Sequence, residues 1–233
     1  MYKMDGRIRY SEVGMDGTLT MTGLVNYFQD CSTFHSEDVG LGLEFLLDRG
    51  RAWILSGWQI VIERMPGLDE HVCVSTWPYE FKGFMGMRNY EMTDSDGKRL
   101  AAANSLWTLI DVKKRCPVRI VDEDIDGYEI EEKADMVYAP RKIKPQGECR
   151  KEKPVYITRE RIDTNGHMNN GQYIGIASEY LPEDVSVRQI RVEYRKEVRA
   201  GEELIPYLYG GERGLTVVLD RADSDCAVVE FTW

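Results

Sequence analysis

The stretches "WQIVIERMPGLDEHVCV" (residues 58–74) and "RQIRVEYRKEVRAGEELIP" (residues 188–206) follow a common plan. Gln59 in the first matches Gln189 in the second, and an isoleucine follows both. Each stretch alternates apolar and polar residues and then enters a glycine-containing turn, which is typical of a β-strand that continues into a hairpin. Such internal similarity predicts a chain made of two related halves.

The segments around these stretches also repeat. A helical spacing of apolar residues precedes each one, with Thr22 as the expected N-cap of the first helix and Asn169 or Asn170 as that of the second. Three apolar-alternating runs accompany each half, at 71–81, 84–93 and 99–112 and at 203–210, 215–222 and 226–233. We therefore predict an α+β fold in which each half is a long helix wrapped by an antiparallel sheet.

A charged segment with three prolines, 131–154, separates the two patterns. Because it shows no clean period, we predict an N-terminal domain at 1–135, a surface linker at 136–154 and a C-terminal domain at 155–233.

Composition excludes several classes of protein. The 233 residues are 42% hydrophobic and 30% charged, without an apolar run long enough to cross a bilayer, so we expect no membrane insertion and a cytoplasmic location. The five cysteines are scattered and there are three histidines, which argues against disulfides and a metal site. The net charge of −10 argues against nucleic-acid binding, and no glycine-rich phosphate loop is present, so we expect no cofactor.

The motif "IDTNGHMNNGQYI" (162–174) is the candidate for chemistry. The run "VYITRERI" before it reads as a strand, and in an extended chain Asp163, Asn165 and His167 would share one face. The pair Asn165-Gly166 is also a turn signal, so this extension is one of two readings. The helix expected to follow would offer free N–H groups to an oxyanion.

These residue types suit hydrolysis at a carbonyl carbon. A histidine handles protons near neutral pH, and an amide holds a water or the base. Because the motif lacks serine and cysteine, an attacking water is favoured over a side-chain nucleophile. The alternative is that Asp163 only forms a turn and Asn169 only caps a helix.

The order Asp-x-Asn-Gly-His-Met-Asn-Asn-x-x-Tyr resembles the signature of acyl-[acyl carrier protein] thioesterases of the hot-dog superfamily. The stretch "AAANSLWTLIDVKKRCPVRI" (101–120) resembles the end of that family's first domain. The resemblance implies a tandem hot-dog fold whose first domain holds the acyl chain and whose second carries the catalytic residues. It also implies acyl-loaded carrier protein as substrate, free fatty acid as product and no cofactor; a homodimer is compatible with it.

The resemblance implies a catalytic set of Asp163, Asn165, His167 and Glu197, the last from "YRKEV" (194–198). Val198 stands where plant members have cysteine, so Glu197 and His167 would act on water, oriented by Asn165. Asp163 would fix the loop or the imidazole. The alternative for Glu197 is an exposed strand carboxylate paired with its arginine neighbours, unless a β-bulge turns it inward.

Two other functions stay open at this point, an acyl-CoA thioesterase and a non-catalytic or dehydratase-like acyl-binding protein. An acidic carrier protein would need a basic surface on this acidic chain. Residues 141–153 and the arginine-rich strand from Arg188 to Arg199 are the candidates, and we favour the strand because it lies close to Glu197 in sequence.

Overall fold

The computed structural model describes residues 1–222 and 224–233 and divides them into two compact units. The first unit comprises Met1–Ser56 and Ile62–Tyr138, and the second comprises Gly57–Val61 and Ala139–Trp233. Strand β2 (Arg51–Ile62) therefore contributes residues to both.

The first unit is an antiparallel sheet with one long helix. Its strand order is β1-β3-β4-β5, with β6 paired to β5 and β2 beside β5. The strands are β1 (Tyr2–Arg7), β3 (His71–Lys82), β4 (Met85–Asp94), β5 (Arg99–Asp111) and β6 (Cys116–Pro117). The helical elements are η1 (Tyr10–Glu12), α1 (Met21–Asp38), α2 (Leu43–Asp48) and η2 (Asp122–Asp124). The strands expected at 71–81, 84–93 and 99–112 are confirmed.

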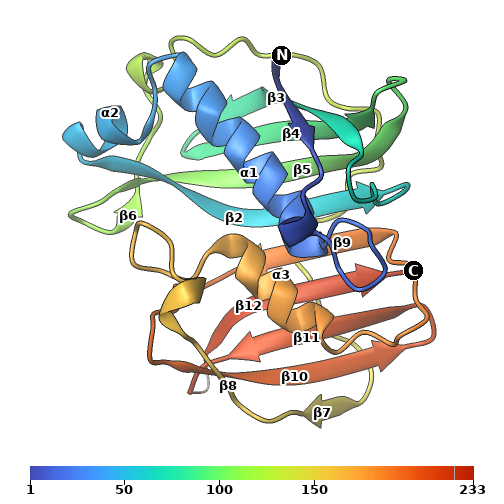
Figure 1. Cartoon of the computed structure of the whole chain (residues 1–233). Coiled ribbons are helices and arrows are strands. Elements are labelled where there is room, and N and C mark those ends of the chain that lie inside the picture. Colours follow the sequence, from blue (N-terminus) through green and yellow to red (C-terminus); the bar gives the residue numbers. More distant parts are fainter. Residues whose placement is uncertain (223) are drawn as a thin grey trace. The chain divides into compact units, whose positions relative to one another are not determined.

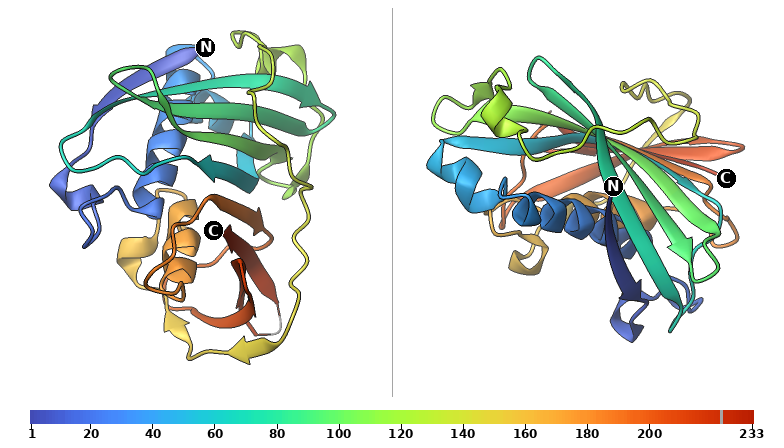
Figure 2. Two further views of the ribbon diagram at one scale, coloured as in Figure 1. Left: turned by 90° about the vertical axis from the view of Figure 1, so that its right-hand side faces the viewer. Right: turned by 90° about the horizontal axis from the view of Figure 1, so that it is seen from above.

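Helix α1 packs against β1 and β3 and covers one face of this sheet (Figure 2). Its buried side includes Leu24, Phe28, Cys31 and His35, which recur every three or four residues. The ring of Phe28 lies 5.3 Å from that of Tyr90 on β4. The apolar spacing of the sequence thus corresponds to the face that meets the sheet.

The N-cap of α1 is Thr20, so the expected cap at Thr22 is wrong. Thr20 has the extended backbone that a cap requires, and its Oγ1 accepts a hydrogen bond from the N–H of Gly23 at 3.1 Å. Thr22 already lies in the first turn of the helix, two residues after the cap.

His35 is buried in the first unit and is packed rather than exposed to a site. Its Nδ1 lies 2.9 Å from Nη1 of Arg88, and its ring stacks on Tyr2 and meets Tyr128 edge-on. Burial, together with the positive charges of Arg88 and the N-terminus, lowers the pKa of His35 to about 4, although Asp38 opposes this. The imidazole is therefore neutral in the folded protein at neutral pH.

We expect the first unit to lose stability as the pH falls from about 6.5 to about 4. In this window His35 takes up a proton in the unfolded chain but not in the folded one, since its folded pKa is the lower of the two. The full difference between the two pKa values corresponds to about 3 kcal/mol in the free energy of unfolding. Urea unfolding at several pH values should show a smaller loss for His35→Gln, while His71→Gln, at an exposed position, follows the wild type. The same pH dependence of the free energy of unfolding in the wild type and both variants would contradict the prediction.

The second unit repeats the arrangement with a shorter helix. Its strand order is β9-β12-β11-β10-β7, with Gly57–Val61 of β2 beside β9 and β8 paired to β10. The strands are β7 (Cys149–Lys151), β8 (Val155–Tyr156), β9 (Gln189–Tyr194), β10 (Glu203–Gly211), β11 (Gly214–Asp220) and β12 (Asp225–Thr232). The 3-10 helix η3 (Arg159–Arg161) precedes α3 (Asn170–Ser178), which packs against β11 and β12 (Figure 1).

Helix α3 has nine residues against eighteen in α1, so it is shorter than the long helix we expected. Pro182 explains the early end. It has no N–H to donate to the carbonyl of Ser178, and it disfavours the helical conformation of the residue before it. The expected cap at Asn169 is confirmed, because its side chain accepts the N–H of Gly171 at 2.9 Å.

Most of the segment expected as a linker, 136–154, belongs to the second unit. Ile143 is 1% exposed and packs with Val218 and Val228, while its N–H donates to Glu193 Oε2 at 3.2 Å. Further along, β7 pairs with β10. Within the described residues, no helix combines the length and apolarity needed to cross a membrane.

Candidate active site

The motif 162–174 forms a closed turn followed by a helix. Ile162 and Met168 are bridged as antiparallel partners, and the N–H of Asp163 donates to the carbonyl of His167 at 2.8 Å. Gly166 closes the turn with φ of 77°, a backbone region that favours glycine. The strand expected through residue 162 is therefore wrong: β8 ends at Tyr156, and the Asn-Gly turn signal decides the local structure.

The carboxylate of Asp163 holds this turn together. Its Oδ1 accepts the backbone N–H of Asn165 at 2.8 Å and that of His167 at 3.3 Å. This is the way in which aspartate replaces a backbone acceptor in a turn. Of the two roles expected for Asp163, the geometry favours fixing the loop over contacting the imidazole.

We therefore expect Asp163→Asn to retain activity within a few-fold, because the amide oxygen still accepts both N–H groups. Asp163→Ala should lower kcat about tenfold, because the backbone N–H groups of Asn165 and His167 lose their acceptor in the turn at a cost of roughly 1–2 kcal/mol. Thioester hydrolysis by the two variants, with circular dichroism as a folding control, checks this. A strong loss in Asp163→Asn would assign a charge-dependent role to this residue.

The structure brings Glu197 to His167. Nε2 of His167 lies 3.0 Å from Oε2 of Glu197, and the two side chains are 31% and 35% exposed. A carboxylate only accepts hydrogen bonds, so this contact requires a hydrogen on Nε2. Nδ1 of the neutral ring is then the free proton acceptor.

A β-bulge after β9 turns Glu197 toward the motif. The N–H groups of both Arg195 and Lys196 donate to one acceptor, the carbonyl of Cys226 on β12, at 2.8 and 3.1 Å. Two residues on one strand opposite a single residue on the next define a β-bulge. The extra residue moves the side chains that follow it to the other face of the sheet. The N–H of Met168 then donates to the carbonyl of Val198 at 2.8 Å, which ties the two segments together.

Arg199 also belongs to the site, although the sequence did not indicate this role. Its Nη2 lies 3.3 Å from Oε1 of Glu197 and 3.5 Å from Nε2 of His167. The alternative reading of Glu197, a carboxylate paired with a neighbouring arginine, is thus also present. The signal that could have found Arg199 is its spacing of two from Glu197, which places both on one side of an extended segment.

Asn165 does not meet the imidazole in this structure. It is exposed at the tip of the turn, and its carboxamide makes no hydrogen bond within the described part of the chain. The first N–H groups of α3 are also engaged, since Gly171 donates to the Asn169 side chain and Gln172 donates to the Asn169 carbonyl. The oxyanion role expected for this helix start therefore has no free donor at these two positions.

The tyrosine of the motif is a packing residue. Tyr173 is 3% exposed, and burial raises its pKa well above the ordinary value. Its ring lies 5.4 Å from that of Tyr194, whose hydroxyl donates to the carbonyl of Asn170 at 2.9 Å. Val198 is fully buried. These contacts position the helix start and the Glu197 segment without taking part in chemistry.

Two arginines of the strand favoured as a docking surface are already paired with acids. Arg191 pairs with Glu230 at 2.7 Å, and Arg195 pairs with Glu193 and Asp225. This reduces the case for the strand as the docking surface. The described residues contain no cluster of three or more histidine, cysteine, aspartate or glutamate residues that could hold a metal ion.

Solved structures define the class of this fold as a tandem hot-dog. An acyl-ACP thioesterase from Bacteroides thetaiotaomicron matches with a TM-score of 0.91 and 25% identity, covering 99% of this chain and 96% of that one. The 12:0-ACP thioesterase from Umbellularia californica matches with a TM-score of 0.83 and 20% identity over 100% of this chain and 96% of that one. The predicted fold class is confirmed.

Two family models match the chain, the acyl-ACP thioesterase N-terminal domain at residues 1–128 and the acyl-ACP thioesterase C-terminal domain at residues 145–212. The chain therefore belongs to the acyl-ACP thioesterase family. It is 26% identical over 215 residues to the chloroplastic acyl-[acyl-carrier-protein] hydrolase FATB2 of Cuphea viscosissima, covering 84% of this chain and 52% of that protein. The chain thus spans about half the length of the curated relatives it matches.

Proposed function

We propose that this protein hydrolyses fatty acyl-ACP thioesters to free fatty acid and carrier protein, which ends chain elongation. The observation that carries the proposal is the 3.0 Å contact between His167 Nε2 and Glu197 Oε2 beside the family motif. An imidazole and a carboxylate in contact can accept and return a proton, which thioester hydrolysis by water requires.

In the proposed mechanism His167 moves the proton and Glu197 supports it. Nδ1 of His167 takes a proton from water as the water oxygen attacks the carbonyl carbon of the thioester. The tetrahedral intermediate then collapses with cleavage of the carbon–sulfur bond, and the imidazolium returns the proton to the leaving thiolate. Glu197 keeps Nε2 protonated and offsets the positive charge of the imidazolium, as the acidic partner does in other histidine-based sites.

The remaining residues have positioning roles in this proposal. The guanidinium of Arg199 lies 3.3 Å from Oε1 of Glu197 and helps to hold that carboxylate beside the imidazole. Asp163 fixes the turn that carries His167, and the exposed amide of Asn165 is free to hold the attacking water or the thioester oxygen once substrate is bound.

The test compares acyl-ACP and acyl-CoA thioesters of equal chain length at low salt. The proposal expects a higher kcat/KM for the carrier-protein substrate. A preference for the coenzyme would reassign the protein as an acyl-CoA thioesterase. Absence of hydrolysis of either thioester by the wild type would instead favour a non-catalytic acyl-binding or dehydratase-like module, and undiminished hydrolysis by both His167→Ala and Asn165→Ala would show that these two groups do no chemistry.

We also propose that the protein acts in the cytoplasm and assembles as a homodimer. Cell fractionation and light scattering at several protein concentrations test these two proposals. A membrane-bound fraction or a constant monomer mass would overturn the corresponding one.

A further inference from the structure

A pocket of about 360 Å³ lies in the second unit beside the candidate site. Its lining residues are Tyr156, Ile157, Thr158, Arg159, Ala200 and Gly201. The volume falls at the lower end of the range of small-molecule sites, which is roughly 300–1,000 Å³. The pocket therefore suits a slender ligand or part of a larger one.

Both walls of the pocket continue into the candidate site. Ala200 directly follows Arg199, whose guanidinium lies 3.5 Å from Nε2 of His167. The other wall continues into η3, where the carbonyl of Arg161 accepts the N–H of Asn169 at 2.9 Å. A ligand in this pocket thus lies along the two segments that position the imidazole.

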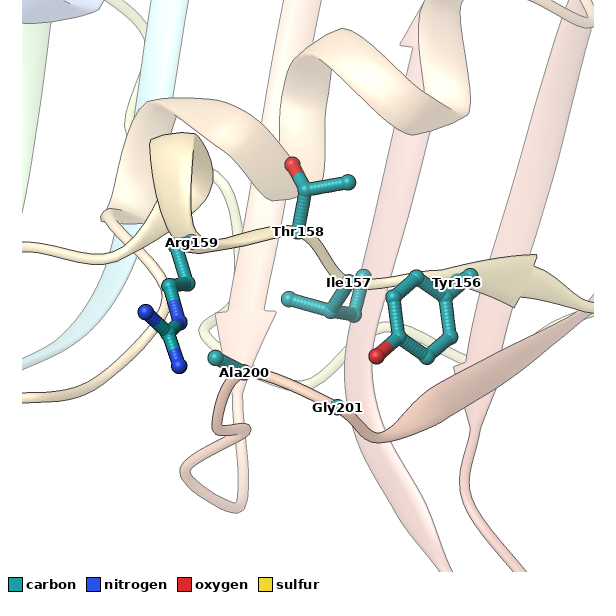
Figure 3. Close-up of a pocket in the computed structure, with 6 residues that line it drawn as sticks. All are labelled: Tyr156, Ile157, Thr158, Arg159, Ala200 and Gly201. Carbon is teal, nitrogen blue, oxygen red and sulfur yellow. The ribbon is translucent and has the colours of Figure 1, made fainter.

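Backbone hydrogen bonds fix the two walls to each other. The N–H of Ile157 donates to the carbonyl of Glu202, and the N–H of Gly201 donates to the carbonyl of Ile157, both at 2.9 Å. Figure 3 shows the side chains of Tyr156 and Arg159 extending toward Gly201 and Ala200, while Thr158 points away. Ile157 is fully buried and forms the floor.

The chemistry of the lining is cationic at one end and aromatic at the other. Arg159 is the single charged residue of the lining, and its guanidinium has no acidic partner among residues 1–222 and 224–233. This contrasts with Arg191 and Arg195, which have acidic partners. Tyr156 is 58% exposed, which leaves much of its ring available for contact.

We propose that this pocket receives the phosphopantetheine arm of the acyl carrier protein, with Arg159 binding its phosphodiester. This inference rests on the proposed function. A guanidinium donates two parallel hydrogen bonds to phosphate oxygens, the Tyr156 ring covers the dimethyl part of the arm, and the thiol end continues past Ala200 toward His167. An unpartnered cation here also gives an acidic chain a local site for an anionic substrate.

Binding of holo and apo carrier protein tests the proposal, because only the holo form carries the arm. Arg159→Ala should weaken binding of the holo form about tenfold and leave the apo form unchanged, whereas Arg159→Lys should retain part of the difference. Arg213→Ala is the matched control: it removes a cation beyond the far end of β10, about 26 Å along the strand from its start. Ala200→Phe, at an exposed position, should fill the pocket and also reduce holo binding selectively.

Kinetics with an acyl-pantetheine thioester that lacks the phosphate provide a second readout. Arg159→Ala should leave KM for this substrate unchanged while raising KM for acyl-ACP. Equal effects on holo and apo carrier, or none on either, would overturn the pocket assignment while wild-type hydrolysis of acyl-ACP still supports the proposed function. Absence of wild-type hydrolysis would overturn the proposed function itself, and the binding comparison would still decide the pocket.

Discussion

Replacing His167 with alanine is expected to lower kcat for acyl-ACP hydrolysis on the order of 10³-fold with little change in KM or folding. General acid–base catalysis contributes about 10²–10⁴-fold, and His167 is the group that would both accept and return the proton. Its partial exposure, 31%, means that truncation leaves no large cavity. Steady-state kinetics and thermal unfolding measure the two effects separately.

His71→Ala is the control for this prediction, because it removes another histidine at an exposed position at the start of β3. Added imidazole should restore part of the activity of His167→Ala, since a free imidazole can enter the vacated, partly exposed site. A retained kcat in His167→Ala would remove the basis of the mechanism.

The second large effect is expected for Glu197→Gln, again on the order of 10³-fold in kcat. The amide oxygen of glutamine still accepts a hydrogen bond from Nε2 of His167, so the imidazole keeps its orientation. The negative charge that offsets the imidazolium is lost, and Arg199 is left 3.3 Å from a neutral group. Steady-state kinetics of two variants separate the effects of charge and side-chain length. Glu197→Gln keeps the length and removes the charge, whereas Glu197→Asp keeps the charge on a shorter side chain.

Glu230→Gln is the matched control for charge removal. Its carboxylate pairs with Arg191 at 2.7 Å, in the same unit but without contact to His167. We expect activity close to that of the wild type. If Glu197→Gln behaves like Glu230→Gln, Glu197 is a surface ion-pair partner of Arg199 and not part of the chemistry.

Local patterns in the sequence were sufficient for most of the regular elements, although not for the strand expected through residue 162 or for the length of α3. Alternation of apolar residues predicted β3, β4 and β5, and the spacing of Leu24, Phe28, Cys31 and His35 predicted the buried face of α1. Asn169 as a cap and Asn165-Gly166 as a turn follow from side-chain chemistry within a few residues. Such features depend on neighbours in sequence, so they are readable without the fold.

The site required more than local pattern. The motif of 162–174 indicated His167 and its loop, and the family resemblance indicated Glu197, which the alternation of β9 by itself would leave on the outer side. For Asn165 the motif was misleading. Its position suggested that its side chain would lie beside His167, but the turn leaves it exposed. The role of Arg199 and the inclusion of most of 136–154 in the second unit were not predicted.

The sequence by itself determined the duplicated α+β plan, most of the strands, the buried face of α1 and the histidine of the motif. Only the tertiary structure decided that Glu197 reaches His167, because the carbonyl of Cys226, on another strand, accepts two consecutive N–H groups and forms the bulge. It likewise decided that Ile143 is buried against Val218 and Val228. Register between distant strands arises from hydrogen bonds and packing across the sheet, and no short stretch of sequence contains both partners.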